Sequence, residues 1–176
     1  MTQVKSFPPL LGSSANALIV GSMPGAASLA ANQYYAHPRN AFWPIMGELF
    51  GADPNFDYQR RVVRLTQAHI AVWDVIGACV RPGSLDADIQ HEGMVVNDFR
   101  GLLDRHPEIC RVYFNGAKAE QLFEKMVLPT LANGDVFRRR LPSTSPANAS
   151  MKFQKKLAAW RCIVDDSALP RNAGRS

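Results

Sequence analysis

The stretch from Ala17 to Trp43 constrains the fold of this chain more than any other part of the sequence. It begins with an apolar run, ALIV at 17–20, and breaks into a turn, GSMPG at 21–25. A short apolar run bounded by Gly and Pro is typical of a buried strand that ends in a loop. In open α/β sheets, ligands bind in the crevice beyond the carboxyl ends of the strands. We therefore expect the 21–25 turn to border a binding site.

Apolar runs alternate with helical patterns along the rest of the chain. The sequence predicts strands at 17–22, 69–76, 110–114 and 135–140. It predicts helices at 40–51, 57–68, 97–105, 117–126 and 150–160, with Asn40 and Asn97 as N-caps and Gly51 as the C-terminal residue of its helix. Residues 1–16, 78–93 and 141–149 are interpreted as irregular, and the chain from about Asp165 as frayed. This alternation indicates a parallel sheet that is covered on both faces.

Composition narrows the class of protein. A length of 176 residues is typical of one domain, and the net charge of +5 favours an anionic partner such as nucleic acid. The three cysteines lie far apart without zinc-ligand spacing, and the four histidines show no metal spacing either. Isolated cysteines without a secretory leader fit a reducing cytoplasm. No apolar run approaches the roughly 20 residues of a membrane span, so we expect no membrane partner.

Several side chains after the first strand allow two interpretations. Asn40 precedes two aromatic residues and is explained either as a helix cap or as a functional amide. Tyr34, Tyr35, Phe42 and Trp43 fit a hydrophobic core and fit a platform for stacking a nucleobase equally well. Spacing alone does not separate these alternatives.

Two later segments also carry chemistry. Asn115 ends an apolar strand, where its amide offers a donor and an acceptor to a base edge, or simply forms an Asn-Gly turn. The loop LPSTSPANA at 141–149 follows Arg138-Arg139-Arg140 and is suited to contacting phosphates. The alternative is an ordinary connection in which Ser145 or Asn148 caps the next helix.

These pieces, in this order, resemble the uracil-DNA glycosylase superfamily. GSMPG at 21–25 with YYAHPRNAFW at 34–43 is most similar to the hypoxanthine-DNA glycosylase branch, and resembles the mismatch-specific uracil/thymine branch more distantly. VYFNG at 112–116 resembles the base-recognition strand of the superfamily. The 141–149 loop resembles the segment that wedges into the duplex. The resemblance covers roughly residues 18–160.

The resemblance implies a three-layer α/β/α sandwich with a central four-stranded parallel sheet, as one domain over 1–176. It implies a monofunctional glycosylase, working as a monomer without metal or cofactor, that flips a deaminated base out of DNA and hydrolyses its N-glycosidic bond in base-excision repair. The best-known uracil enzymes of the superfamily carry an Asp in the first motif and a His in the second. Here Asn40 is the polar residue of the first motif and Leu141 starts the second, so hypoxanthine is the expected substrate, with uracil left open.

The resemblance also implies roles for individual residues. Asn40 would be catalytic, because its amide oxygen can orient a water although an amide does not titrate near neutral pH. The expected base-binding residues are Gly21, Ser22, Met23, Pro24, Gly25, Tyr35, Phe42 and Asn115, with Phe42 stacking on the base and Asn115 reading its edge. The expected DNA-binding residues are Arg140, Ser143, Ser145, Pro146, Ala147 and Asn148. Gly83, Ser84 and Asp86 would line the pocket too.

Two other classes of function remain open at this point. The same basic surface and aromatic residues fit a nucleic-acid binding module without catalysis. A hydrolase of free nucleosides would need the same chemistry at the sugar.

Overall fold

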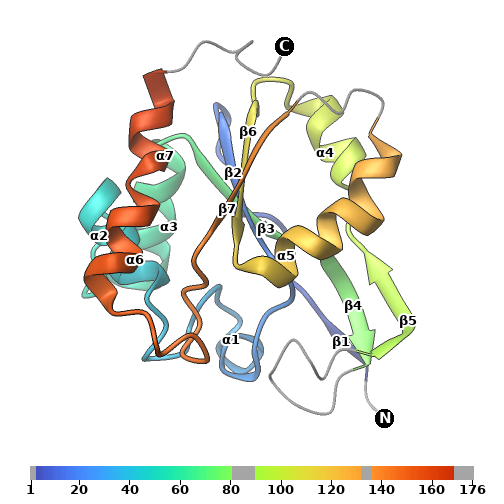
Figure 1. Ribbon diagram of the computed structural model, residues 1–176, viewed down its shortest axis with the longest axis horizontal. Coiled ribbons are helices and arrows are strands. Elements are labelled where there is room, and N and C mark those ends of the chain that lie inside the picture. Colours follow the sequence, from blue (N-terminus) through green and yellow to red (C-terminus); the bar gives the residue numbers. More distant parts are fainter. Residues whose placement is uncertain (1–2, 81–89, 132–135, 169–176) are drawn as a thin grey trace.

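The computed structural model describes residues 3–80, 90–131 and 136–168. Four parallel strands form a central sheet in the order β3-β2-β6-β7. They are β3 (Ile70–Asp74), β2 (Ala17–Gly21), β6 (Arg111–Asn115) and β7 (Phe137–Leu141). This sheet stands between two groups of helices (Figure 1). The predicted α/β/α architecture with a four-stranded parallel sheet is confirmed.

Helices cover both faces of the sheet. One group comprises α2 (Phe42–Phe50), α3 (Tyr58–Gln67), α6 (Phe153–Trp160) and α7 (Cys162–Asp165), and the other comprises α4 (Phe99–Arg105) and α5 (Ala117–Leu122) (Figure 1). The short α1 (Ala26–Ala31) follows the turn after β2. A π-helical turn (Phe123–Val127) continues α5, and 3-10 turns occupy Leu128–Thr130 and Asp166–Ala168. None of the helices within the described ranges has the length and apolarity that a membrane crossing requires.

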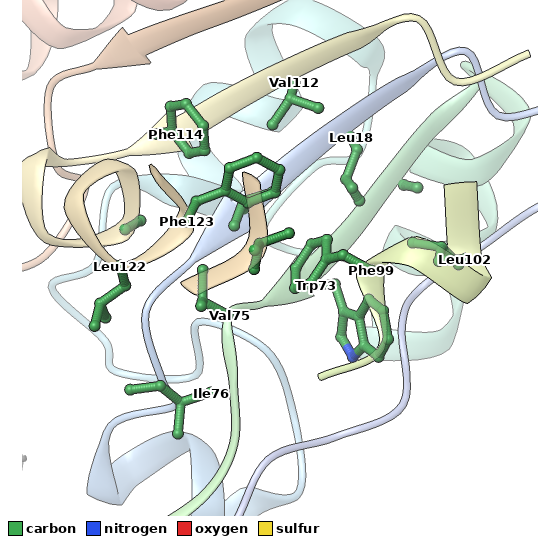
Figure 2. Packing of buried hydrophobic residues seen from close by; sticks show 14 of the residues in the cluster. Leu18, Trp73, Val75, Ile76, Phe99, Leu102, Val112, Phe114, Leu122 and Phe123 are labelled. Carbon is green, nitrogen blue, oxygen red and sulfur yellow. The ribbon is translucent and has the colours of Figure 1, made fainter. Parts of the chain in front are cut away.

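Side chains alternate between the two faces of each strand, so the parallel sheet has one hydrophobic core on each face. On β2, Leu18 and Val20 pack toward α4 and α5, whereas Ile19 packs toward α2 and α6. All five residues of β2 are buried, as a sheet covered on both faces requires. Figure 2 shows the core on the side of α4 and α5, and the ring centroids of Trp73 and Phe99 in this core lie 4.8 Å apart.

A second, antiparallel sheet was not predicted. Its order is β1-β4-β5, from β1 (Gln3–Lys5), β4 (Ile76–Val80) and β5 (Gln90–Val96). The predicted irregular segments 1–16 and 78–93 are therefore wrong in part, and the single strand at 69–76 is two strands. The chain leaves the parallel sheet at Val75, whose N–H donates to the Gly21 carbonyl. The predicted pocket residues Gly83, Ser84 and Asp86 lie outside the described residues.

Helix boundaries differ from the predictions by at most four residues, the largest difference being at the end of α5. Ala41, not Asn40, is the N-cap of α2, and Asp98, not Asn97, caps α4 by accepting from the Gly101 N–H. Gly51 ends α2 with a φ of 69°, as predicted for a left-handed C-terminal residue. The next helix after the 141–149 loop begins at Phe153, so neither Ser145 nor Asn148 caps it.

The segment after α6 is not frayed where it is described. Asp166 is 7% exposed. Its carboxylate accepts a hydrogen bond of 2.9 Å from the Tyr113 hydroxyl and forms an ion pair with Arg139 at 3.1 Å. The prediction of fraying from about Asp165 is wrong for residues up to Ala168, because these contacts tie Asp166 to β6 and β7.

Candidate active site

A cavity of about 550 Å³ lies beyond the carboxyl ends of the parallel strands. Gly21, Asp74 and Asn115, the last residues of β2, β3 and β6, all line it. The remaining wall comes from residues 22–28, 34, 35, 37, 40 and 143–148. The crevice predicted from the first strand is thus present at the expected edge of the sheet.

Most of the residues predicted for a site meet in this cavity. Those that line it are Gly21, Ser22, Met23, Pro24, Gly25, Tyr35, Asn40, Asn115, Ser143, Ser145, Pro146, Ala147 and Asn148. Phe42 and Arg140 are not among its lining residues. The cavity therefore brings together three segments that are far apart in the sequence.

The turn after β2 presents main-chain N–H groups. The carbonyls of Gly21 and Ser22 accept from the N–H groups of Val75 and Ile76, which fixes the start of the turn. Within the described part of the chain, the N–H groups of Met23 and Gly25 have no hydrogen-bond acceptor. Donors of this kind, held in place by the backbone, are suited to an acceptor atom of a ligand.

The side-chain amide of Asn40 is hydrogen-bonded through its oxygen but not through its nitrogen, among the residues that the structure describes. Its Oδ1 accepts from the Phe42 N–H at 2.9 Å, and Asn40 lies one residue before Ala41, the N-cap of α2. Its main-chain N–H donates to the His37 carbonyl at 2.9 Å, and the next N–H, of Ala41, donates to the Thr144 carbonyl at 3.0 Å. The Nδ2 group of Asn40 donates to no other residue in the described ranges. Asn40 thus faces the cavity with a donor and with the second lone pair of Oδ1.

Phe42 cannot provide the predicted stacking surface in this structure. Its side chain is 0% exposed. Tyr35 covers it, with ring centroids 4.0 Å apart and planes inclined by 22°. Tyr35 reaches this position with a φ of 55°, which is uncommon for a residue with a side chain. The expectation for Phe42 is corrected: Phe42 does not line the cavity, whereas Tyr35, which covers Phe42, does.

Behind Tyr35, the hydroxyl of Tyr34 is buried and fixed. It donates to the Pro8 carbonyl at 3.1 Å. Burial, and then the negative charge of Asp74, raises the pKa of Tyr34 above its ordinary value. The hydroxyl therefore stays protonated and keeps residues before β2 attached to the cavity wall.

Asn115 and Thr144 form a reciprocal pair. The Nδ2 of Asn115 donates to the Thr144 hydroxyl at 2.9 Å, and its Oδ1 accepts from the Thr144 N–H at 2.9 Å. A carboxamide presents a donor and an acceptor side by side on only one edge, and here that edge faces Thr144. Asn115 keeps one further N–H and one lone pair toward the cavity. Thr144, 1% exposed, was missed because nothing in the local sequence distinguishes it from its neighbours.

The loop that contains Thr144 is held by its own side chains. The Ser143 hydroxyl accepts from the Ser145 N–H at 3.2 Å, and the Ser145 hydroxyl accepts from the Ala147 N–H at 3.2 Å. Asn148 donates from Nδ2 to the Ser143 carbonyl at 3.1 Å. These bonds, with Pro146, give the loop a defined shape at the rim of the cavity.

The three arginines before this loop diverge. Arg140 forms an ion pair with Glu120 of α5 at 3.3 Å, and its side chain is 55% exposed. Arg139 points the other way and binds Asp166. Exposed ion pairs contribute little to stability, so Arg140 can exchange Glu120 for a phosphate at small cost.

Asp74 is a second cavity residue that the sequence analysis missed. It ends β3 directly after an apolar run, so the signal that drew attention to Asn115 was present here as well. The side chain is buried, with the residue 3% exposed. Its Oδ2 accepts from the Ser6 hydroxyl at 3.1 Å.

Comparisons with known proteins show which family this chain belongs to. The family model of the Uracil DNA glycosylase superfamily matches residues 8–165. A hypoxanthine DNA glycosylase of Methanosarcina acetivorans is 35% identical over 160 residues, 90% of this chain and 96% of the relative. One of Methanosarcina barkeri is 39% identical over 116 residues, 65% of this chain and 72% of the relative. The solution NMR structure of a uracil DNA glycosylase candidate from Methanosarcina acetivorans has a TM-score of 0.74 at 30% identity, covering 93% of this chain and 99% of that one.

Proposed function

Because this chain belongs to the uracil DNA glycosylase superfamily and is a DNA glycosylase, we propose that it removes deaminated bases from DNA, hypoxanthine first and uracil second. The enzyme would act as a monomer in the cytoplasm and begin base-excision repair. Two relatives named hypoxanthine DNA glycosylase support this choice of base. The observation that carries the proposal is the convergence of Asn40, the 21–25 turn and Asn115 on one cavity.

The cavity has the size and walls that a flipped base needs. Its volume of about 550 Å³ lies in the range of small-ligand pockets. The Tyr35 ring, supported from below by Phe42, offers a face for stacking. Extrusion of a base costs a few kcal/mol, and the 143–148 loop at the rim is placed to fill the gap that the base leaves.

Hydrolysis then breaks the bond between the sugar carbon C1′ and the base nitrogen. The bonding electron pair leaves with the base, so negative charge grows on the base while the sugar becomes cationic. The N–H groups of Met23 and Gly25 donate to an acceptor atom of the base and stabilise that charge. Because their positions are fixed by β2 and β4, they need no rearrangement during the reaction.

Asn40 holds the attacking water. The water donates to the free lone pair of Oδ1 or accepts from Nδ2, and the bond between Oδ1 and the Phe42 N–H fixes the orientation of the amide. The water oxygen bonds to C1′, and its proton is taken up by the departing base. An amide removes no proton itself, so the rate depends on position and on how well the base leaves.

The test is a panel of duplexes, each with one deoxyinosine, deoxyuridine, deoxyxanthosine or ethenodeoxycytidine, incubated with the protein and then treated with alkali. We expect strand scission at deoxyinosine above all, with EDTA present throughout. Release of hypoxanthine, measured by chromatography, confirms glycosidic cleavage. Absence of scission on every duplex would refute the proposal.

The same assay distinguishes the other two classes of function. A binding module without catalysis retards the duplexes in a gel but releases no base. A nucleoside hydrolase releases hypoxanthine from free deoxyinosine as fast as from the duplex. We expect duplex cleavage to be faster than cleavage of the free nucleoside, since the 143–148 loop and Arg140 contact only a strand.

A further inference from the structure

The residues just before Asn40 form a tight turn that carries a second polar side chain. The Asn40 N–H donates to the His37 carbonyl at 2.9 Å, which closes the turn. Inside it, the Arg39 N–H donates to Nδ1 of the His37 ring at 3.1 Å. The imidazole of His37 and the amide of Asn40 are thus held by one turn, and both residues line the cavity.

The bond to Arg39 decides which nitrogen of the His37 ring carries the proton. A main-chain N–H group can only donate, so Nδ1 must present its lone pair to it. The proton of the neutral ring is therefore on Nε2. Within residues 3–80, 90–131 and 136–168, Nε2 of His37 has no hydrogen-bond partner. His37, which is only partly buried, thus offers one N–H donor to a ligand.

The charges around His37 favour an anion as that ligand. No carboxylate in the described part of the chain forms an ion pair with His37. The side chain of Arg39, two residues on, is exposed and forms neither an ion pair nor a hydrogen bond with any described residue. An imidazole donor near an unpaired guanidinium is suited to phosphate, because hydrogen bonds to an ionised acceptor are the stronger ones.

The place of His37 in the turn indicates which phosphate of a DNA strand is in reach. Asn40 is proposed to hold a water at C1′ of the flipped nucleotide, and His37 lies three residues earlier in the same turn. The sugar carries one phosphate on its 5′ side and one on its 3′ side, so these are the anions nearest to the reacting carbon. A donor bound to one of them would hold the sugar in position relative to Asn40.

We propose that His37 donates from Nε2 to a phosphate next to the flipped nucleotide and so holds C1′ against the water on Asn40. The inference rests on the proposed function and adds a residue that positions its substrate. His37 takes up no proton in this role. The contact also favours a strand over a free nucleoside, which has no phosphate.

Two substitutions separate this contact from the role of His37 in the turn. In His37→Asn the side-chain oxygen takes the place of Nδ1 and can still accept from the Arg39 N–H, but the donor at Nε2 is gone. In His37→Gln the terminal N–H lies as many bonds from Cβ as Nε2 does, whereas the acceptor for Arg39 is lost. If the ring served only the turn, Gln would be the worse variant, whereas the phosphate contact makes Asn the worse one.

We expect single-turnover release of hypoxanthine from a deoxyinosine duplex to fall about tenfold or more in His37→Asn, the size expected for one hydrogen bond to a charged group. His37→Gln should stay within about threefold of the wild type. His106→Asn, at the end of α4, makes the same change away from the cavity and should not alter the rate. A full rate in His37→Asn, or a Gln variant no faster than the Asn variant, would overturn the inference.

A neutral phosphate identifies the partner of His37. A methylphosphonate replaces the phosphate on the 5′ or the 3′ side of deoxyinosine, and each duplex is compared in the wild type and in His37→Asn. In the wild type, one of the two replacements should slow release about tenfold or more. In the Asn variant the same replacement should cost less than about threefold, because the contact is already lost. Equal costs in the two proteins at both positions contradict a phosphate contact.

His37→Asp covers the case of an Asn variant that does not fold, which its thermal melting curve would reveal. Its carboxylate can also accept from the Arg39 N–H but repels a phosphate, so release should fall at least as far as in His37→Asn. An Asp variant at the wild-type rate, or a wild type that neither methylphosphonate slows, refutes the inference. A wild type that cleaves no duplex refutes the proposed function instead, so the two failures are distinguishable.

Discussion

Replacing Thr144 with Val removes one buried hydrogen bond from the centre of the site. Val has nearly the shape of Thr, and both main-chain bonds of residue 144, to Asn115 Oδ1 and from the Ala41 N–H, remain possible. What is lost is the acceptor for Asn115 Nδ2, 2.9 Å away. Because Thr144 is 1% exposed, water has little access to replace it.

The magnitude follows from the cost of an unpaired buried donor, which is about 1–3 kcal/mol. For a domain of this size, a loss of about 2 kcal/mol lowers the melting temperature by roughly 4–8 °C. Thr144→Ser keeps the hydroxyl and deletes one methyl group, which costs about 1 kcal/mol. We expect the Ser variant to be the more stable of the two.

Catalysis should separate the variants more sharply than stability does. In Thr144→Val the Asn115 amide is held only through Oδ1, and the 143–148 loop loses one of its two bonds to Asn115, so the single-turnover rate should fall by about tenfold or more. In Thr144→Ser the amide stays fixed and the rate should stay within about threefold of the wild type. Urea titration gives the stability and base release gives the rate. A Val variant equal to the wild type in both, or less impaired than the Ser variant, would refute the pairing argument.

Two further predictions concern Asn40 and Arg140. Asn40→Ala loses the bond to the Phe42 N–H, which costs about 0.5–2 kcal/mol of stability, so the variant should fold and bind DNA but lose most of its turnover. Asn40→Asp keeps an acceptor and should still cleave at least one base. Near-normal base release by a folded Ala variant would remove Asn40 from the mechanism. Arg140→Ala loses only an exposed ion pair, so its melting temperature should hardly change, while its affinity for all DNA sequences falls and depends less steeply on salt. Wild-type affinity that is insensitive to salt would contradict the phosphate contact.

Most of the parallel sheet could be predicted because β2, β3 and β6 are short, mainly apolar runs that are buried, whereas β7 carries Arg138–Arg140 and is largely exposed. The small antiparallel sheet could not. Its first strand, Gln3–Lys5, is three residues long and is stabilised by pairing with residues 78–80, far along the chain. Such a partner leaves no mark in the local sequence, whereas an apolar run such as 17–20 does.

The place of the site could be predicted for a related reason. Parallel strands end at one edge, so residues after them, such as Asn40 and Asn115, converge whatever their individual roles. The roles themselves depend on contacts between distant segments. Spacing did not distinguish Tyr35 from Phe42, although one ring covers the other, and it gave no sign that Thr144 occupies the amide of Asn115. Asp74 could have been predicted as a cavity residue in the same way as Asn115, since it too ends a buried strand.

The position of Asp166 late in the chain affects how the protein can fold during translation. The Tyr113 hydroxyl of β6 finds its buried acceptor 53 residues later in the chain. At 5–20 residues per second, synthesis of that interval takes about 3–10 s, and β7 is made within it, so the nascent sheet gains its last strand before this acceptor exists. Arg139 likewise lacks its ion-pair partner until Asp166 has been made. The contacts that complete β6 and β7 therefore depend on a segment that is translated after all four strands of the sheet.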